Sequence, residues 1–85
     1  MSETEQTYGE KAVGLTFNHA EGELHDEVHE VKTTFAKLID LVEGKRTPND
    51  DRFKNTLIST TVSTLVSAQM FVVKVITWKA IEIKK

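Results

Sequence analysis

The fold is decided by residues 23–43, which read ELHDEVHEVKTTFAKLIDLVE. Their apolar positions recur at alternating steps of four and three residues, the spacing of one face of an α-helix. Acids crowd the first turns, where the helix dipole stabilises negative charge. The stretch therefore predicts a helix that begins at Gly22–Glu23 and is ended by Gly44. Its apolar stripe comprises Leu24, Val28, Val31, Phe35, Leu38 and Val42, widened by Ile39 and Leu41.

A second helix is predicted after Pro48, with Asn49 or Asp50 as its N-cap. Many of its residues are β-branched, and residues 71–76 alone would fit a strand. Helix is favoured because the apolar spacing is sustained and no glycine or proline divides the run. The short connection makes the two helices antiparallel neighbours, a helical hairpin. The apolar face of the second helix comprises Phe53, Leu57, Ile58, Val62, Leu65, Val66, Gln69, Val72, Val73 and Ile76.

The expected fold is therefore all-α, with a structured N-terminal arm before the hairpin. We expect one domain over residues 1–85, since 85 residues are too few for two cores. Within it, the arm is expected at 1–21, the first helix at 22–44, a loop at 45–49 and the second helix at 50–82. The sequence has no cysteine, which excludes disulfides, thiolate metal sites and a cysteine nucleophile.

An obligate oligomer is expected, because a two-helix hairpin cannot cover both sides of its second helix. Apolar residues lie off the inner face, and small hydroxyl residues recur every four positions, which lets another helix approach closely. The alternative is a monomer in which the arm covers this surface. The off-face residues are Phe71, Val75, Trp78 and Ile81, and the small rows are Ser59, Ser63 and Ser67, and Thr56, Thr60 and Thr64.

The net charge of −2 is distributed unevenly between the two halves of the chain. Residues 1–43 carry a net charge of −7, and residues 44–85 carry +5. Such halves attract within a hairpin or between chains, although they are also compatible with solvated helix faces. The balanced total argues against DNA or RNA as a partner. No signal peptide is visible, and seven hydroxyl or amide residues interrupt the uncharged stretch 57–73, so we expect a soluble cytoplasmic protein without a membrane span.

Catalytic chemistry has little support in the sequence. His25 and His29 stand four residues apart, like the histidines of a zinc-binding HExxH helix, but Asp26 replaces the glutamate and no third histidine follows. A solvated histidine pair is favoured over a metal-dependent hydrolase or adventitious metal binding. No nucleophile elbow, phosphate loop or dinucleotide fingerprint is present. We therefore expect no enzyme, no catalytic residue, no metal and no cofactor.

Residues 8–18, YGEKAVGLTFN, combine rings, a cation and glycines just before the first helix. Rings stack on bases, backbone N–H groups near glycine bind phosphate, and lysine neutralises it, so this equipment fits a nucleotide. An arm whose apolar residues fill a core would look the same. Lys32 and Lys74 lie among apolar residues, and they either extend to solvent or point into a cleft between chains, where two ammonium groups suit two phosphates.

The segment 8–18 resembles the opening motif of the small phage proteins of the anti-CBASS/anti-Thoeris hairpin-domain family. The resemblance extends through Val31-Lys32 and 35–41 to Ala68-Gln69-Met70, 72–74 and Thr77-Trp78, so it covers about 70 residues from Tyr8 to Trp78.

What the resemblance implies is a sponge that sequesters cyclic oligonucleotide immune messengers without cleaving them, so that the effector stays inactive. Members bind cyclic dinucleotides between protomers, some also bind cyclic trinucleotides in separate pockets, and relatives capture cyclic ADP-ribose isomers. Their hairpins interlock into dimers and then a hexamer, in the cytoplasm of the infected bacterial host. The alternative function is a helical protein-interaction module that binds a host protein through the second helix.

The resemblance also implies roles for individual residues. Phe17 matches an aromatic, usually tyrosine, that stacks on a base, and here it lacks the hydroxyl. Lys32 matches a phosphate-binding lysine of the first helix. Lys74 occupies the place of a basic residue that is often arginine, and it cannot form a bidentate clamp. Further candidates for the same or a second pocket are Tyr8, Lys11, Gly14 and Asn18.

Overall fold

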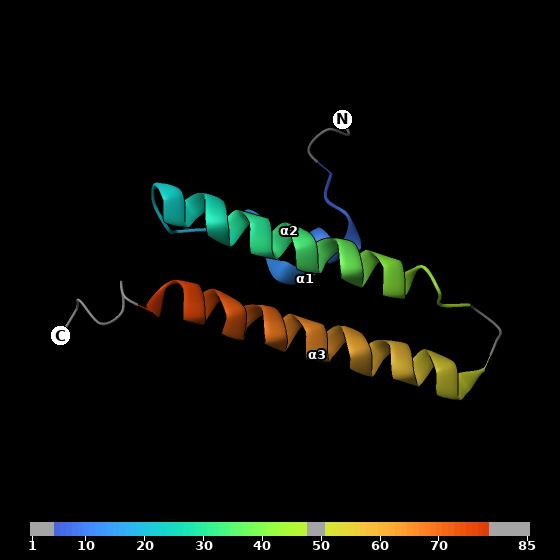
Figure 1. The fold of residues 1–85 in the computed structure, drawn as a ribbon. Coiled ribbons are helices and arrows are strands. Elements are labelled where there is room, and N and C mark those ends of the chain that lie inside the picture. The colour runs from blue at the N-terminus through green and yellow to red at the C-terminus, as the bar shows by residue number, and fades with distance from the viewer. Residues whose placement is uncertain (1–4, 48–50, 79–85) are drawn as a thin grey trace.

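The computed structural model describes residues 5–47 and 51–78, and three helices account for most of them. They are α1 (Tyr8–Val13), α2 (Glu23–Glu43) and α3 (Arg52–Ile76), and these ranges contain no strand. The predicted all-α class is therefore confirmed. In Figure 1, α2 and α3 lie side by side with opposite chain directions, and α1 lies against α2.

The N-terminal segment differs from the expected arm, because it contains α1. Thr7 and Glu10 form a capping box: the Glu10 amide donates to Thr7 Oγ1 over 3.1 Å, and the Thr7 amide donates to Glu10 Oε1 over 3.0 Å. Gly14, with φ 64°, ends the helix in the left-handed conformation that glycine adopts without strain. The prediction of an arm over residues 1–21 overlooked the Thr-x-x-Glu signal, which is typical of a helix start.

Helix α1 docks on α2 at Gly9, where the two backbones come close together. A Cβ atom at Gly9 would lie 2.8 Å from the Ala36 carbonyl carbon and 2.9 Å from Asp40 Oδ1, which is too close for any side chain. The absent side chain also lets the Gly9 amide donate to Asp40 Oδ1 over 2.7 Å. Glycine is therefore required here by the close approach of α1 to α2.

The core lies where α1 and α3 meet α2. It is centred on Ile39, which is fully buried, and consists of Val13, Ala36, Ile39, Ile58 and Val62. The predicted stripes are only partly buried: Leu38 and Leu41 of α2 are 42% and 59% exposed, and Phe53 and Leu57 of α3 are 87% and 65% exposed.

The buried residues of α2 differ from the predicted stripe. Helix α1 packs over Ala36, a small residue that is not part of that stripe. The buried positions of α2 are spaced by four, four and three residues. Lys32 is one of them, so a lysine lies on the buried face of α2. The buried residues of α2 are Val28, Lys32, Ala36 and Ile39.

The observed ends of α2 and α3 differ in part from the predicted ones. Gly44 follows α2 with a right-handed φ of −65°. The N-cap of α3 is Asp51, whose Oδ1 accepts the Phe53 amide over 3.0 Å, whereas the expected caps Asn49 and Asp50 lie outside the described residues. Helix α3 ends at Ile76, and the Thr77 hydroxyl and amide both donate to the Val73 carbonyl at this end. The predicted end at 82 lies outside the described residues.

Helix α3 is long and apolar enough to cross a bilayer by length and composition alone. This is weak evidence for a membrane span, because long apolar helices of other kinds meet the same two criteria. Its exposed surface also carries hydroxyl residues and Lys74.

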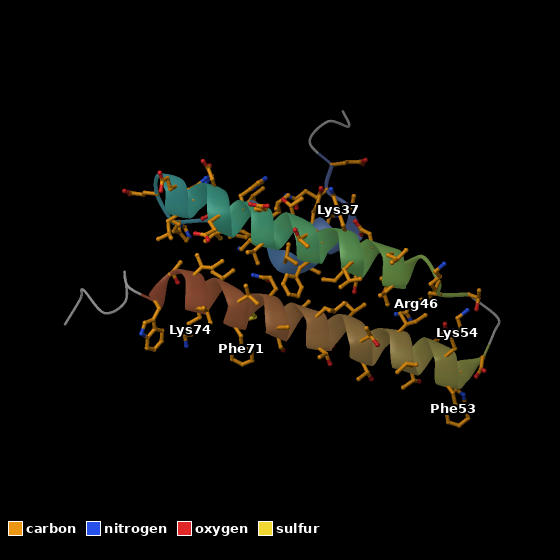
Figure 2. The ribbon with its side chains drawn as sticks, viewed as in Figure 1. Lys37, Arg46, Phe53, Lys54, Phe71 and Lys74 are labelled. Carbon is orange, nitrogen blue, oxygen red and sulfur yellow. The ribbon has the colours of Figure 1, made fainter. Side chains whose placement is uncertain are left out.

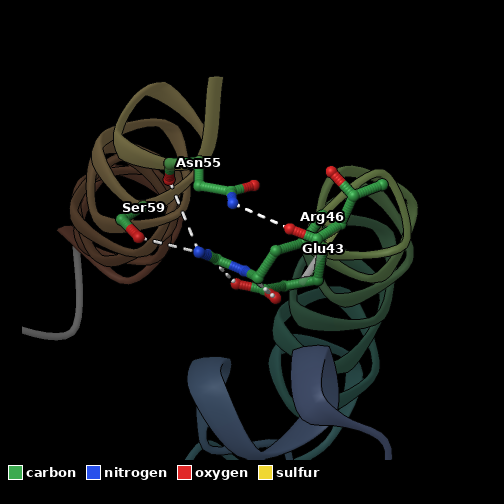
Figure 3. A network of polar contacts seen from close by, with 5 residues as sticks. Glu43, Arg46, Asn55 and Ser59 are labelled. Carbon is green, nitrogen blue, oxygen red and sulfur yellow. Dashed lines mark hydrogen bonds and ion pairs between the residues drawn. The ribbon is translucent and has the colours of Figure 1, made fainter. Parts of the chain in front are cut away.

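Arg46 ties the turn between α2 and α3 to both helices (Figure 3). Its Nε and Nη2 atoms donate to the Glu43 carboxylate over 3.0 and 2.8 Å, and Nη2 also donates to Ser59 Oγ over 3.1 Å. The Arg46 side chain thus links the end of α2 to the start of α3. Its hydrogen bond lowers the pKa of Glu43 below the usual 4.5.

This contact gives a pH-dependent prediction. A carboxyl group with a lowered pKa in the folded state stabilises the fold above its unfolded pKa, and this contribution is lost as the pH falls through the folded value. Arg46→Met should therefore lower the Tm at pH 7, with a gap to the wild type that narrows as the pH falls below about 4.5. Thermal unfolding at several pH values measures the gap. Arg52→Met, which removes an exposed cation outside the network, is the matched control, and a gap that does not change with pH would contradict the prediction.

Candidate ligand-binding cavity

A cavity of about 350 Å³ opens between the loop before α2, the first half of α2 and the last turns of α3. Apolar side chains form most of its wall, and a small number of polar groups reach it, the combination typical of small-molecule sites. The lining residues are Phe17, Asn18, His19, Ala20, Leu24, Val28, Lys32, Val73 and Thr77.

Lys32 is the cation of this wall, and it is only 8% exposed. Its Nζ donates to the Phe17 carbonyl over 2.7 Å and to the Gly14 carbonyl over 3.0 Å. Burial lowers the pKa of the ammonium below its usual 10.5. An ammonium group has three donors, so two hold the protein together and one remains for a ligand.

The turn from Gly14 to Phe17 is held by Lys32 and by its own backbone. The Phe17 amide donates to the Gly14 carbonyl over 2.8 Å. A Cβ atom at Gly14 would lie 3.3 Å from Phe17 Cδ2, so glycine leaves room for the ring beside it. The Phe17 side chain itself is 70% exposed. The ring therefore lines the cavity with much of its surface open to solvent, next to a fixed ammonium group.

Asn18 shapes the loop that follows. Its Nδ2 donates to the His25 carbonyl over 2.9 Å, and its Oδ1 accepts the Ala20 amide over 3.1 Å. These bonds fasten residues 18–20 to the start of α2, which has no side-chain cap of its own at Gly22. Asn18 thus acts on the shape of the cavity through the backbone while also lining it.

The structure brings four of the seven predicted site residues together and leaves three apart. Phe17, Lys32 and Asn18 line the cavity, and Gly14 contacts Lys32. The other three, Tyr8, Lys11 and Lys74, are exposed and do not line it. Lys74 projects from the side of α3 that faces away from α2 (Figure 2), so one chain does not place Lys32 and Lys74 on a common ligand.

Sequence reasoning missed most of the wall. The periodicity places Leu24 and Val28 in the core stripe and Val73 on the inner face of the second helix, because it does not separate a core position from a cavity position. The residue type of His19 does not indicate a cavity position, and Thr77 enters the sequence analysis only as part of the resemblance. The missed lining residues are His19, Ala20, Leu24, Val28, Val73 and Thr77.

The surroundings of the cavity are acidic. Five acids lie on the segment that leads into α2 and along its first two turns: Glu21, Glu23, Asp26, Glu27 and Glu30. Among the described residues that line the cavity, Lys32 is the only lysine or arginine, and it lies near these acids. Among the described residues, no three histidine, aspartate or glutamate side chains gather as a potential metal site. No protein-family model, curated protein or solved structure matches this chain.

Proposed function

We propose that this chain binds cyclic oligonucleotides and sequesters them without cleaving them. The observation that carries the proposal is the direct hydrogen bond, 2.7 Å long, between the Lys32 ammonium and the backbone of Phe17 in the wall of one cavity. A base and a phosphate are the two parts of a nucleotide that proteins recognise most generally, and the two side chains supply one contact for each.

The base would stack on Phe17. Its ring is 70% exposed and lies beside an apolar wall that includes Leu24 and Val73. Aromatic stacking tolerates any base, so selectivity would come from polar atoms near the base edge. Asn18, His19 and Thr77 are the lining residues with such uncharged polar groups.

The phosphate would bind the third donor of Lys32. The other two donors are bonded to the Gly14 and Phe17 carbonyls, so the ammonium is already oriented before a ligand arrives. A preorganised charge loses less entropy on binding than a free lysine does. Binding with slow release is what a sponge requires, and it needs no catalytic group.

A second copy of the chain would complete the site. A cavity of 350 Å³ is at the small end of ligand sites, and a cyclic dinucleotide carries two phosphates for the single cation of the wall. Lys74 faces away from its own cavity, which is consistent with a role in a neighbouring one. An assembly of interlocked hairpins, dimers joined into a hexamer, would provide this arrangement and would cover the outer face of α3, where Phe71 and Val75 are 67% and 72% exposed.

The same outer face favours one other function, a module that binds a host protein. Exposed apolar side chains along one side of a helix are a common protein-binding surface. They are Phe53, Leu57, Phe71 and Val75 of α3, and Trp78 just after it. This function needs no small ligand, so a ligand titration separates the two proposals.

The test is isothermal titration with cyclic dinucleotides, cyclic trinucleotides and cyclic ADP-ribose isomers. We expect one class to bind with a Kd below about 1 µM and to be recovered intact after the protein is heated. Phe17→Ala should weaken binding about 5- to 150-fold, the range for losing one base stack, without unfolding an exposed position. Leu41→Ala, which truncates an exposed apolar residue of α2 outside the cavity, should bind normally. If no ligand binds, or if Phe17→Ala binds like the wild type, the proposal fails.

A further inference from the structure

The first two turns of α2 carry a pair of histidines that the proposed function does not use. The rings of His25 and His29 are stacked, with centroids 6.4 Å apart and planes 7° from parallel. Both residues are exposed, and each is four residues from the other, so they stand one above the other on the same side of the helix. The two rings are therefore neighbours across one turn of α2, within reach of one another.

We propose that His25 and His29 form a bidentate site for a divalent transition-metal ion. Imidazole nitrogen is a preferred ligand of Cu²⁺, Ni²⁺ and Zn²⁺, and nitrogen–metal bonds of about 2.0–2.1 Å require two rings that can converge. Rings on adjacent turns meet this requirement by rotation about their side-chain bonds, and solvent exposure leaves those rotations free. Water fills the remaining coordination positions.

The surrounding charge favours a cation. Asp26 Oδ1 lies 3.5 Å from His25 Nδ1, and Glu30 follows His29 directly. Together with Glu21, Glu23 and Glu27, these carboxylates create a negative potential that raises the local concentration of metal ions. These carboxylates attract the ion to the region, and the two imidazole rings coordinate it.

The backbone that carries the pair is held before any metal binds. Asn18 Nδ2 donates to the His25 carbonyl, and Lys32, one turn beyond His29, is fixed by the Gly14 and Phe17 carbonyls. A metal ion therefore meets a formed helix and does not have to order one.

The site is independent of nucleotide binding, and the test uses the full chain with each metal salt alone. Isothermal titration should show one Cu²⁺ per chain, bound more tightly than Ni²⁺ or Zn²⁺, as the order of divalent-metal affinities requires. His25→Ala and His29→Ala should each lower the affinity for Cu²⁺ at least about tenfold. His19→Ala removes an exposed histidine from the cavity wall and should bind Cu²⁺ like the wild type.

A register control tests the geometry with the number of histidines unchanged. The double variant His29→Ala, Glu30→His places two imidazoles on α2 about 140° apart around the helix axis, where they cannot share an ion. It should bind Cu²⁺ as weakly as His29→Ala, and Cu²⁺ should raise the Tm of the wild type but not of this variant. Wild-type affinity in the double variant, less than a tenfold loss in either single variant, or an equal loss in His19→Ala would overturn the site.

Discussion

Replacing Lys32 with methionine is expected to abolish nucleotide binding and to lower the stability of the fold at the same time. The Lys32 ammonium donates to the Gly14 and Phe17 carbonyls, and methionine leaves both without this partner. The Gly14 carbonyl keeps the Phe17 amide as a partner, so the larger loss is at the Phe17 carbonyl. A lost hydrogen bond to a charged group costs about 1.5–3 kcal/mol, partly offset here because a buried charge is removed as well. We expect a net loss of about 1–3 kcal/mol and a Tm lower by roughly 4–24 °C.

Lys32→Met should weaken nucleotide binding by more than the removal of one positive charge alone would. The ligand would lose the third donor of Lys32, and the turn that positions Phe17 would lose its anchor. We expect at least a 100-fold rise in Kd, about 2.7 kcal/mol, measured at a temperature where the variant is folded by circular dichroism. Lys37→Met, which removes an exposed lysine of the same helix, is the matched control for charge and should change neither property. A Lys32→Met protein with a normal Tm and normal Kd would show that the ammonium neither anchors the turn nor binds the ligand.

Lys32 also shows how far the sequence predicts the site. Its position in the middle of an apolar stripe identifies it as unusual, and the sequence leaves open whether it reaches solvent or a cleft. The structure shows a third arrangement, in which the ammonium bonds the backbone of its own chain. Backbone carbonyls carry no sequence signal, so this contact could not be predicted from residue types.

The fold, too, is predicted from the sequence only in part. The two long helices are predicted from periodicity, because burying one face of a helix imposes a repeat that the sequence must carry. The short helix α1 has only 6 residues, too few for a periodic pattern, and its signal lies in the Thr7–Glu10 capping box. Its position on α2 determines which residues are buried there, so the stripe predicted for a two-helix hairpin does not match the buried face at Leu38 and Leu41.

The role of α1 can be tested at Gly9. Gly9→Ala is expected to destabilise the protein by about 3 kcal/mol and to lower its Tm by roughly 12–24 °C, because the added Cβ would overlap the backbone of Ala36. A flexible side chain could move aside, but the carbonyl of a helix cannot. Relief requires α1 to move away from α2, which also breaks the bond from the Gly9 amide to Asp40.

Gly44→Ala is the matched control, since the same substitution is made at a right-handed φ of −65°, where the new Cβ would lie 3.3 Å from the Asp40 carbonyl oxygen. It should change stability by less than about 1 kcal/mol. Thermal unfolding compares the two variants, and nucleotide titration of the folded Gly9→Ala protein extends the test to function. Since α1 leads directly into the turn from Gly14 to Phe17, undocking it should displace Phe17 and weaken binding although Gly9 lies outside the cavity. Equal stability of the two variants would mean that α1 does not pack on Ala36, and that the turn is held in place by Lys32 alone.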